Sequence, residues 1–163
     1  MNLYNKHRPP SLAGVVGQQK AVSQFETFFK RGNVPHAILL HGPSGCGKTT
    51  LARIIRRELA CSAEDYFEVN CADFKGIDTI REIRARMRSA PFFGKVKMWV
   101  IDEAQKLTGD AQSAILKILE DTPPHVYFVL CTTDPQKISK PIHTRCTAVK
   151  LDGVPAGQRV WIA

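Results

Sequence analysis

The sequence feature that most restricts this chain is a glycine-rich segment, Gly42-Pro43-Ser44-Gly45-Cys46-Gly47-Lys48-Thr49, which lies between a short apolar run and a stretch with helical periodicity. The segment fits the pattern G-x-x-x-x-G-K-[ST] at every fixed position. Its glycines let backbone N–H groups turn inward around a phosphate, and the following helix adds the positive end of its dipole. We expect Lys48 to reach the β- and γ-phosphates of a nucleotide and Thr49 to bind Mg²⁺. A glycine-rich turn without a ligand is the alternative, and the strand and helix that flank the segment argue against it.

The rest of the chain alternates predicted strands and helices, which indicates crossover connections and a parallel sheet. Strands are expected at Ala37–His41, Tyr66–Asn70, Val96–Ile101, Val126–Cys131 and Thr147–Leu151. Helices are expected around Val22–Phe29, stopped by Gly32, and at Thr49–Ala60, Ile77–Ala90 and Asp110–Glu120, the last capped by Thr108. We therefore predict one three-layer α/β domain over residues 1–163 with a parallel five-stranded sheet. Ligands of such sheets bind outside the carboxyl ends of the strands.

The composition indicates which kinds of partner and which cellular compartment to expect. The chain has 23 Lys and Arg against 15 Asp and Glu, and this net charge of +8 favours an acidic partner such as nucleic acid. A basic solvated surface is the alternative. No apolar run is long enough to span a membrane, so no membrane partner is expected. The five cysteines form no Cys-x-x-Cys pair, which argues against structural zinc and favours a reducing compartment.

Two carboxylates follow a strongly apolar predicted strand. Met98-Trp99-Val100-Ile101 leads directly into Asp102 and Glu103. In a parallel sheet this strand end lies beside the glycine-rich loop. We expect Asp102 to hold Mg²⁺, directly or through water, and Glu103 to polarise an attacking water. Acids that merely mark the end of a strand are the alternative, which the glycine-rich loop makes the weaker interpretation.

Two further polar positions later in the chain are candidates for the site. Thr133, with Thr132 in reserve, follows a buried strand and could sense the γ-phosphate, although threonines are also ordinary turn residues. Arg145 precedes the last strand. It gains a role only where a neighbouring subunit presents its nucleotide, as an arginine finger supplied in trans; otherwise it is a solvated charge.

The chain resembles AAA+ ATPases of the DNA clamp-loader group, namely replication factor C small subunits and the bacterial gamma/tau subunit. The segments that carry the resemblance are His7-Arg8-Pro9, Val15-Val16-Gly17-Gln18, Glu68-Val69-Asn70-Cys71-Ala72-Asp73, Gly76-Ile77-Asp78, Thr132-Thr133-Asp134-Pro135-Gln136-Lys137 and Pro141-Ile142-His143-Thr144-Arg145-Cys146. The resemblance implies the three-layer phosphate-loop NTPase (AAA+) core, with ATP and Mg²⁺ as cofactors.

The resemblance also assigns roles by position. It implies a nucleotide-binding set of Arg8, Pro9, Val16, Gly17, Gly42, Pro43, Ser44, Gly45, Cys46, Gly47, Lys48, Thr49 and Thr50. Thr49 and Asp102 would bind the metal. Glu103, Thr133 as sensor 1, and Arg145 as the finger for the adjacent subunit would form the catalytic set. Asn70 lies where related ATPases place a polar residue that holds the catalytic glutamate inactive.

Three departures from the family pattern stand out. Thr144 replaces a serine, a change that keeps the hydroxyl. The bacterial subunit's cysteine-rich zinc insertion is missing between Cys61 and Cys71. The chain ends soon after Leu151, so we expect the helical lid, its sensor 2 arginine and the collar to be absent. We also expect weaker ATP affinity and self-assembly.

A basic edge is expected on the helix that begins at Ile77. Ile77, Ile80, Ile83 and Met87 would form its apolar face, and Arg81, Arg84 and Arg88 fall along one edge of that face. Together with Lys75 and Lys106, Arg81 and Arg84 are candidate contacts to nucleic-acid phosphates. The alternative is a solubilising edge whose long stems cover apolar surface.

These observations favour an ATP-hydrolysing subunit of a sliding-clamp loader, in the cytoplasm or, in a eukaryote, the nucleus. Its partners would be other loader subunits, a sliding clamp and primed DNA. A non-catalytic ATP-binding assembly subunit is one alternative, and Asp102-Glu103 argues against it. Another AAA+ motor, such as a branch-migration helicase, is the second.

Overall fold

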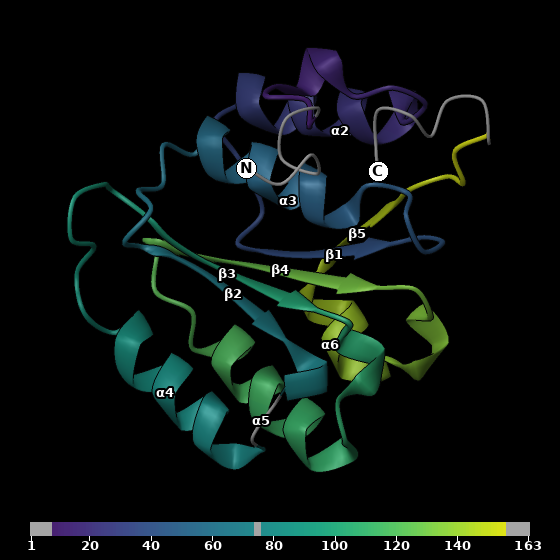
Figure 1. Ribbon diagram of the computed structural model, residues 1–163. Coiled ribbons are helices and arrows are strands. Elements are labelled where there is room, and N and C mark those ends of the chain that lie inside the picture. Colours follow the sequence, from purple (N-terminus) through teal and green to yellow (C-terminus); the bar gives the residue numbers. More distant parts are fainter. Residues whose placement is uncertain (1–7, 74–75, 156–163) are drawn as a thin grey trace.

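The computed structural model describes residues 8–73 and 76–155 (Figure 1). The strands are β1 (Ala37–His41), β2 (Tyr66–Asn70), β3 (Lys97–Asp102), β4 (Val126–Thr132) and β5 (Thr147–Lys150). The α-helices are α2 (Gln19–Lys30), α3 (Lys48–Glu58), α4 (Ile77–Met87), α5 (Gly109–Glu120) and α6 (Lys140–Arg145). The short 3-10 turns are η1 (Leu12–Gly14), η2 (Cys71–Asp73), η3 (Ala104–Lys106) and η4 (Pro135–Lys137).

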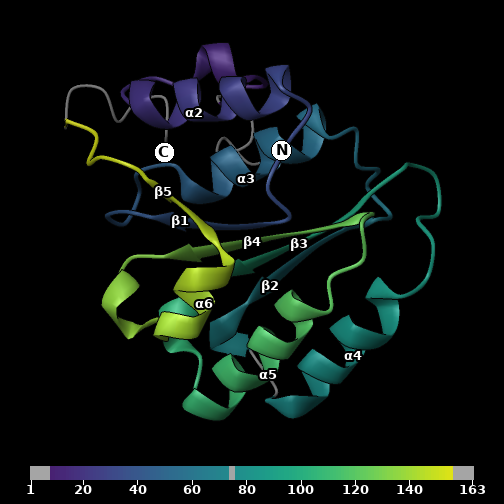
Figure 2. The ribbon, with the colours of Figure 1, turned by 180° about the vertical axis from the view of Figure 1, so that it is seen from behind.

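The sheet has five strands in the order β2-β3-β4-β1-β5, and all neighbouring pairs are parallel. Helices α2 and α3 cover one face, while α4, α5 and α6 cover the other (Figures 1 and 2). This confirms the prediction of a three-layer α/β domain with a parallel five-stranded sheet. Because β4 lies between β1 and β3, the loop after β1 and the acidic end of β3 meet at the same edge.

The two layers of helices are held by apolar cores on both faces of the sheet. Strand β3 is buried at every residue except its last, and Trp99 stacks on Phe67 and Phe128 at centroid distances of 4.7 and 5.7 Å. Burial of this kind stabilises a domain by about 25 cal/mol per Å² of apolar surface. The end of β3, which carries the acidic pair, is therefore anchored in the core.

The predicted strands and most helices occur where the sequence places them, with two differences. Helix α6 was not predicted, because it is short and its residues show no helical pattern of apolar side chains. Ile77 was predicted on the buried face of α4 but is 54% exposed, so that prediction is wrong. Ile77 is the first residue of the helix, and its side chain lies beyond the edge of the core that Ile80, Ile83 and Met87 enter.

Gln112 connects the turns on either side of the site. From α5 its Nε2 donates to the carbonyl oxygens of Leu107 and Lys137 at 3.4 and 2.9 Å, and its Oε1 accepts from Ser139 N at 2.7 Å. The predicted cap of α5 is present, since the Thr108 hydroxyl accepts from Ala111 N. These bonds fix the segment after β4 against α5.

Within the two described ranges, no helix combines the length and the apolar character needed to cross a bilayer.

Candidate nucleotide-binding and hydrolysis site

The glycine-rich loop joins the end of β1 to the start of α3. Gly45 and Gly47 have φ values of +73° and +98°, a region that residues with a side chain rarely adopt. A Cβ at Gly42 would lie 2.4 Å from the carbonyl oxygen of Leu151. The loop is therefore closed in a shape that depends on its glycines.

Lys48 lies at the centre of this loop and is 8% exposed. Its Nζ donates to the carbonyl oxygens of Gly42 and Pro43, each at 2.8 Å, and lies 3.7 Å from Cys46 Sγ. Pro43, Ser44 and Gly45 are exposed at the rim. Burial raises the pKa of the Cys46 thiol, and Lys48 only partly offsets the rise, which keeps the thiol neutral beside the loop. A buried ammonium group held by loop carbonyls at the start of α3 fits an anionic phosphate group.

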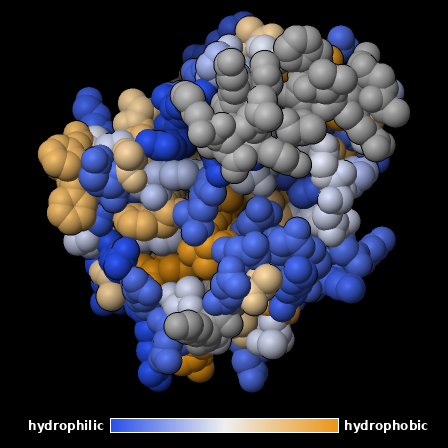
Figure 3. All heavy atoms as spheres, in the orientation of Figure 1, coloured by the Kyte–Doolittle hydropathy of each residue, from blue (hydrophilic) through white to orange (hydrophobic). Residues whose placement is uncertain are grey.

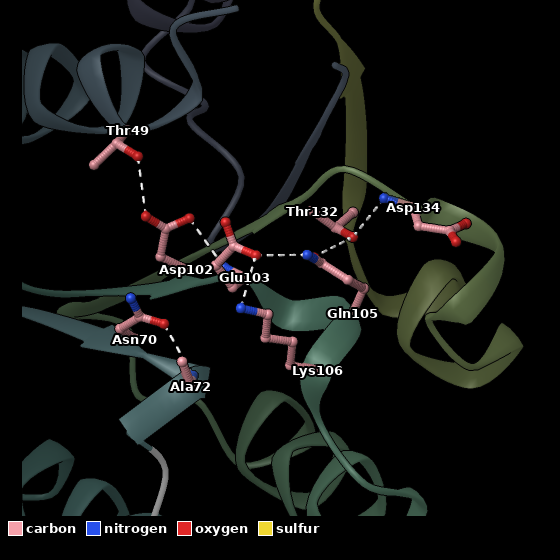
Figure 4. Close-up of polar contacts among 9 residues, drawn as sticks. All are labelled: Thr49, Asn70, Ala72, Asp102, Glu103, Gln105, Lys106, Thr132 and Asp134. Atoms are coloured by element: carbon pink, nitrogen blue, oxygen red, sulfur yellow. Dashed lines mark hydrogen bonds and ion pairs between the residues drawn. The ribbon is translucent and has the colours of Figure 1, made fainter. Parts of the chain in front are cut away.

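Thr49 and Asp102 meet beside the loop. Thr49 Oγ1 donates to Asp102 Oδ2 at 3.1 Å, so a hydroxyl from α3 and a carboxylate from β3 share one small volume (Figure 4). Oxygen donors of these types are those that Mg²⁺ prefers. The donor set therefore fits the metal that accompanies a nucleotide.

Glu103 follows in a left-handed backbone conformation with φ of +57°. Such a conformation in a residue other than glycine stores strain and is concentrated at functional sites. Glu103 Oε2 accepts from Gln105 Nε2 at 2.7 Å and lies 3.6 Å from Lys106 Nζ. Figure 4 shows its carboxylate beside that of Asp102, at the edge of the sheet that the glycine-rich loop also reaches.

The two candidate sensor threonines differ in burial. Thr132 is fully buried, and its hydroxyl donates to Gln105 Oε1 at 3.0 Å and accepts from Asp134 N at 3.0 Å. Thr133 is exposed at the carboxyl end of β4. The exposed Thr133 hydroxyl is thus the one available to a ligand, while Thr132 fixes the strand end from within.

Asn70 and Arg145 have other partners. Asn70 Oδ1 accepts from Ala72 N at 2.9 Å, at the end of β2. Among the described residues, the polar contacts of the Glu103 side chain come from Gln105 and Lys106 instead. Arg145 ends α6, is 54% exposed, and donates to Glu120 at 3.2 Å.

A small apolar pocket lies behind the loop. It is lined by Pro9, Gly14, Val15, Val16, Gln18, Cys46, Gly47, Thr50, Leu51 and Leu151. Gln18 closes it: its Nε2 donates to the carbonyls of Cys46 and Asp152, and its Oε1 accepts from Asp152 N. Five predicted nucleotide contacts line this pocket, namely Pro9, Val16, Cys46, Gly47 and Thr50. Gly17 precedes Gln18 with a φ of +78°, and the buried Nε and Nη1 of Arg8 have no partner within the described residues. The lining suits the flat apolar face of a base.

The predicted nucleic-acid residues that the structure describes have different surroundings. Lys75 lies outside the described residues. Arg81 is exposed 3.8 Å from Asp78, and Arg84 donates to Asp121 at 3.4 Å. Lys106 lies in η3 beside Glu103, at the site itself. Ion pairs this exposed contribute little to stability and leave the cations accessible.

Comparison with known sequences shows the family to which the chain belongs. The family model described as "DNA polymerase III, delta subunit" matches residues 17–78 and 72–155. The chain is 34% identical over 168 residues to DNA polymerase III subunit gamma/tau of Mycobacterium tuberculosis, covering 89% of this chain and 29% of that protein. It is 37% identical over 157 residues to replication factor C small subunit 1 of Pyrobaculum islandicum, covering 93% and 47%. The chain belongs to the clamp-loader AAA+ ATPases. It spans less than half the length of these clamp-loader relatives.

Solved structures agree with this clamp-loader AAA+ fold. The Holliday junction branch migration motor RuvB of Thermotoga maritima superposes with a TM-score of 0.71 at 26% identity, over 89% of this chain and 48% of that chain. A DNA polymerase III gamma subunit-related protein of the same organism, 23% identical, shares the fold with a TM-score of 0.66 over 82% and 47%.

Sequence reasoning missed three glutamines at the site, Gln18, Gln105 and Gln112. Gln18 and Gln105 lie within segments already singled out, next to Gly17 and two residues after Glu103. A glutamine within such a segment was the available signal, because an amide that becomes buried there must find hydrogen-bond partners.

Proposed function

We propose that this chain is an ATP-binding and ATP-hydrolysing subunit of a sliding-clamp loader, which couples ATP to the opening of a clamp and its loading on primed DNA. The observation that carries the proposal is the contact of Thr49 with Asp102 at 3.1 Å beside Glu103. It unites a metal-binding pair and a candidate base at the mouth of a phosphate-binding loop.

Each residue of the site has a proposed role that follows from its position. Lys48 and the loop amides would bind the β- and γ-phosphates, with Thr49 and Asp102 holding Mg²⁺, which when bound neutralises charge on those phosphates. Glu103 would accept a proton from the attacking water through its accessible oxygen, and Thr133 would orient the γ-phosphate. The pocket that Val16 and Thr50 line would hold the adenine.

Partner subunits complete the proposed mechanism. Arg145 is exposed at the end of α6, where its guanidinium contacts Glu120 on the surface. From there it would reach the nucleotide of an adjacent subunit. Arg81, Arg84, Lys75 and Lys106 remain proposed contacts for DNA phosphates.

One exposed apolar feature fits the proposed clamp contact. Phe92 and Phe93, between α4 and β3, are 74% and 77% exposed, and Figure 3 shows apolar side chains at that edge of the molecule. The carboxylate of Asp65 accepts from both of their backbone N–H groups. Exposed basic residues Arg88 and Lys95 flank the pair. A rigid aromatic pair with basic neighbours suits an apolar pocket with an acidic rim on a protein partner.

The test is ATP turnover by the chain together with its partner loader subunits, with and without primed DNA and a sliding clamp. We expect turnover that requires Lys48 and rises when DNA and clamp are both present. A Lys48→Ala chain in the same assembly is the baseline. Turnover that ignores the clamp and rises instead with a four-way DNA junction would favour a branch-migration motor, which the likeness to RuvB makes the second candidate.

A further inference from the structure

A hydrogen-bonded chain of side chains connects Glu103 to the end of β4. Glu103 Oε2 accepts from Gln105 Nε2 at 2.7 Å, and Gln105 Oε1 accepts from Thr132 Oγ1 at 3.0 Å. Figure 4 shows Gln105 between the two, reaching from η3. One amide thus spans the distance between the proposed base and the strand that ends at the proposed sensor.

The direction of these bonds is fixed by the carboxylate of Glu103, which when ionised can only accept. The NH₂ group of Gln105 must therefore face Glu103, which turns its amide oxygen toward Thr132. Thr132 Oγ1 also accepts from Asp134 N at 3.0 Å, and its own proton is donated to Gln105. Gln105 is therefore an obligatory donor to the carboxylate.

This bond also leaves Glu103 with one accessible oxygen. Both Gln105 and Lys106 contact Oε2, and within the described part of the chain Oε1 has no hydrogen-bond partner. The partly exposed carboxylate is thereby restrained through Oε2, and Oε1 stays available to a ligand. A base must be held in place before its basicity matters.

We propose that Gln105 is the positioning residue for Glu103. We further propose that its bond to Thr132 makes the Glu103 carboxylate move when the end of β4 moves. The proposal rests on the proposed function, since it concerns how the same carboxylate is oriented. A shift of Thr133 on a γ-phosphate would move Thr132, its chain neighbour, and Gln105 would transmit that shift to Glu103. Gln105 itself touches no reacting atom.

The first variant is Gln105→Leu, which keeps the size of the side chain and removes both bonds. We expect kcat to fall ~10-fold or more, as for other hydrogen-bond partners of site ligands, with KM for ATP and the melting temperature little changed. Gln24→Leu, the same substitution on α2 in the opposite layer, is the matched control and should leave kcat unchanged. A Gln105→Leu chain with normal kcat would overturn the proposal.

A second variant separates donation from packing. Glutamate at position 105 has the same shape and can still accept from Thr132, but when ionised it cannot donate to Glu103. Gln105→Glu should therefore be at least as slow as Gln105→Leu at neutral pH. Normal turnover in Gln105→Glu would mean that position 105 only fills space.

The link to β4 is tested by a double-mutant cycle with Thr132→Val. If Gln105 carries the effect of Thr132, the double variant should be no slower than the slower single variant. Multiplied losses would show two independent roles and would contradict the coupling.

Binding of ADP with aluminium fluoride supplies a readout that needs no turnover. Wild-type chain should bind this transition-state mimic more tightly than ADP, and Gln105→Leu should lose the difference while keeping its affinity for ADP. A wild-type chain with neither turnover nor this preference contradicts the proposed function itself. If wild type shows both turnover and this preference, and Gln105→Leu shows them to the same extent, only the role of Gln105 is contradicted.

Discussion

Thr49 Oγ1 donates a hydrogen bond to Asp102 Oδ2 at 3.1 Å, which joins residues 53 positions apart in the sequence. The contact exists because β4 lies between β1 and β3, so the first turn of α3 and the end of β3 reach the same edge of the sheet. The proposed metal-binding pair is therefore brought together by the strand order.

Thr49→Val tests the metal-binding pair. Valine keeps the branched shape and removes the hydroxyl, so we expect the Mg²⁺ concentration for half-maximal ATP binding to rise roughly tenfold, ~1.4 kcal/mol. The measurement is a titration of Mg²⁺ at fixed ATP. Thr144→Val, at an exposed threonine of α6, is the control. An unchanged midpoint in Thr49→Val would remove Thr49 from the metal site.

Gly42→Ala tests the close approach of the loop to the chain after β5. Because the new Cβ would lie 2.4 Å from the carbonyl oxygen of Leu151, backbone must move. We expect a loss of about 1–3 kcal/mol in the free energy of unfolding and weaker ATP binding. Gly109→Ala, at a position with open space around the Cβ, should show neither effect.

Asp65 supplies a pH-dependent contribution to stability. Burial would raise the pKa of its carboxyl, but hydrogen bonds from Phe92 N, Ser62 Oγ and Phe93 N outweigh burial and hold the pKa below its usual range. A carboxyl with a lowered folded-state pKa stabilises the protein above its unfolded pKa of about 3.9, and this contribution is lost as pH falls through the folded value.

Asp65→Asn should therefore cost about 1.5–3 kcal/mol of unfolding free energy at pH 7, and the gap from wild type should shrink below about pH 4. Urea titrations between pH 3 and pH 7 measure this difference. Glu64→Gln, at the exposed neighbour, should show no such trend. A gap that stays constant across this range would mean that the charge of Asp65 is not what holds the loop.

Phe92→Ala with Phe93→Ala tests the proposed clamp contact. The pair is exposed and lies away from the nucleotide pocket, so basal turnover and the melting temperature should stay near wild type. Stimulation of turnover by the clamp should fall at least tenfold. Ile77→Ala, at another exposed apolar residue on α4, is the control. Val16 is also exposed but lines the pocket, so a substitution there is unsuitable. Full stimulation in the double variant would place the clamp elsewhere.

Much of the fold was accessible from the sequence because its signals are local. The glycine-rich loop is recognised from its own residues and the strand and helix beside it, and the centre of β3, Met98–Ile101, is wholly apolar. Ile77 shows the limit of periodicity: it fits the apolar repeat of α4, yet at the first turn there is no core for it to enter.

The contacts between side chains within the site were harder to predict from the sequence. Gln105 and Thr132 lie 27 positions apart, and their bond depends on the parallel register of β3 and β4. Lys106 was expected among the nucleic-acid contacts because of its charge, and its position 3.6 Å from Glu103 follows from the 3-10 turn after the strand. Neither turn nor register leaves a sequence pattern that predicts a partner.

The most direct measurement of the central claim is ATP turnover and equilibrium ATP binding by wild type, Glu103→Gln and Lys48→Ala in parallel. Glutamine keeps the shape of Glu103 and cannot act as the base, so Glu103→Gln should bind ATP like wild type and turn it over about 10²–10⁴-fold more slowly. Lys48→Ala should lose binding. Turnover in Glu103→Gln equal to that of wild type would contradict the claim that this site hydrolyses ATP through Glu103.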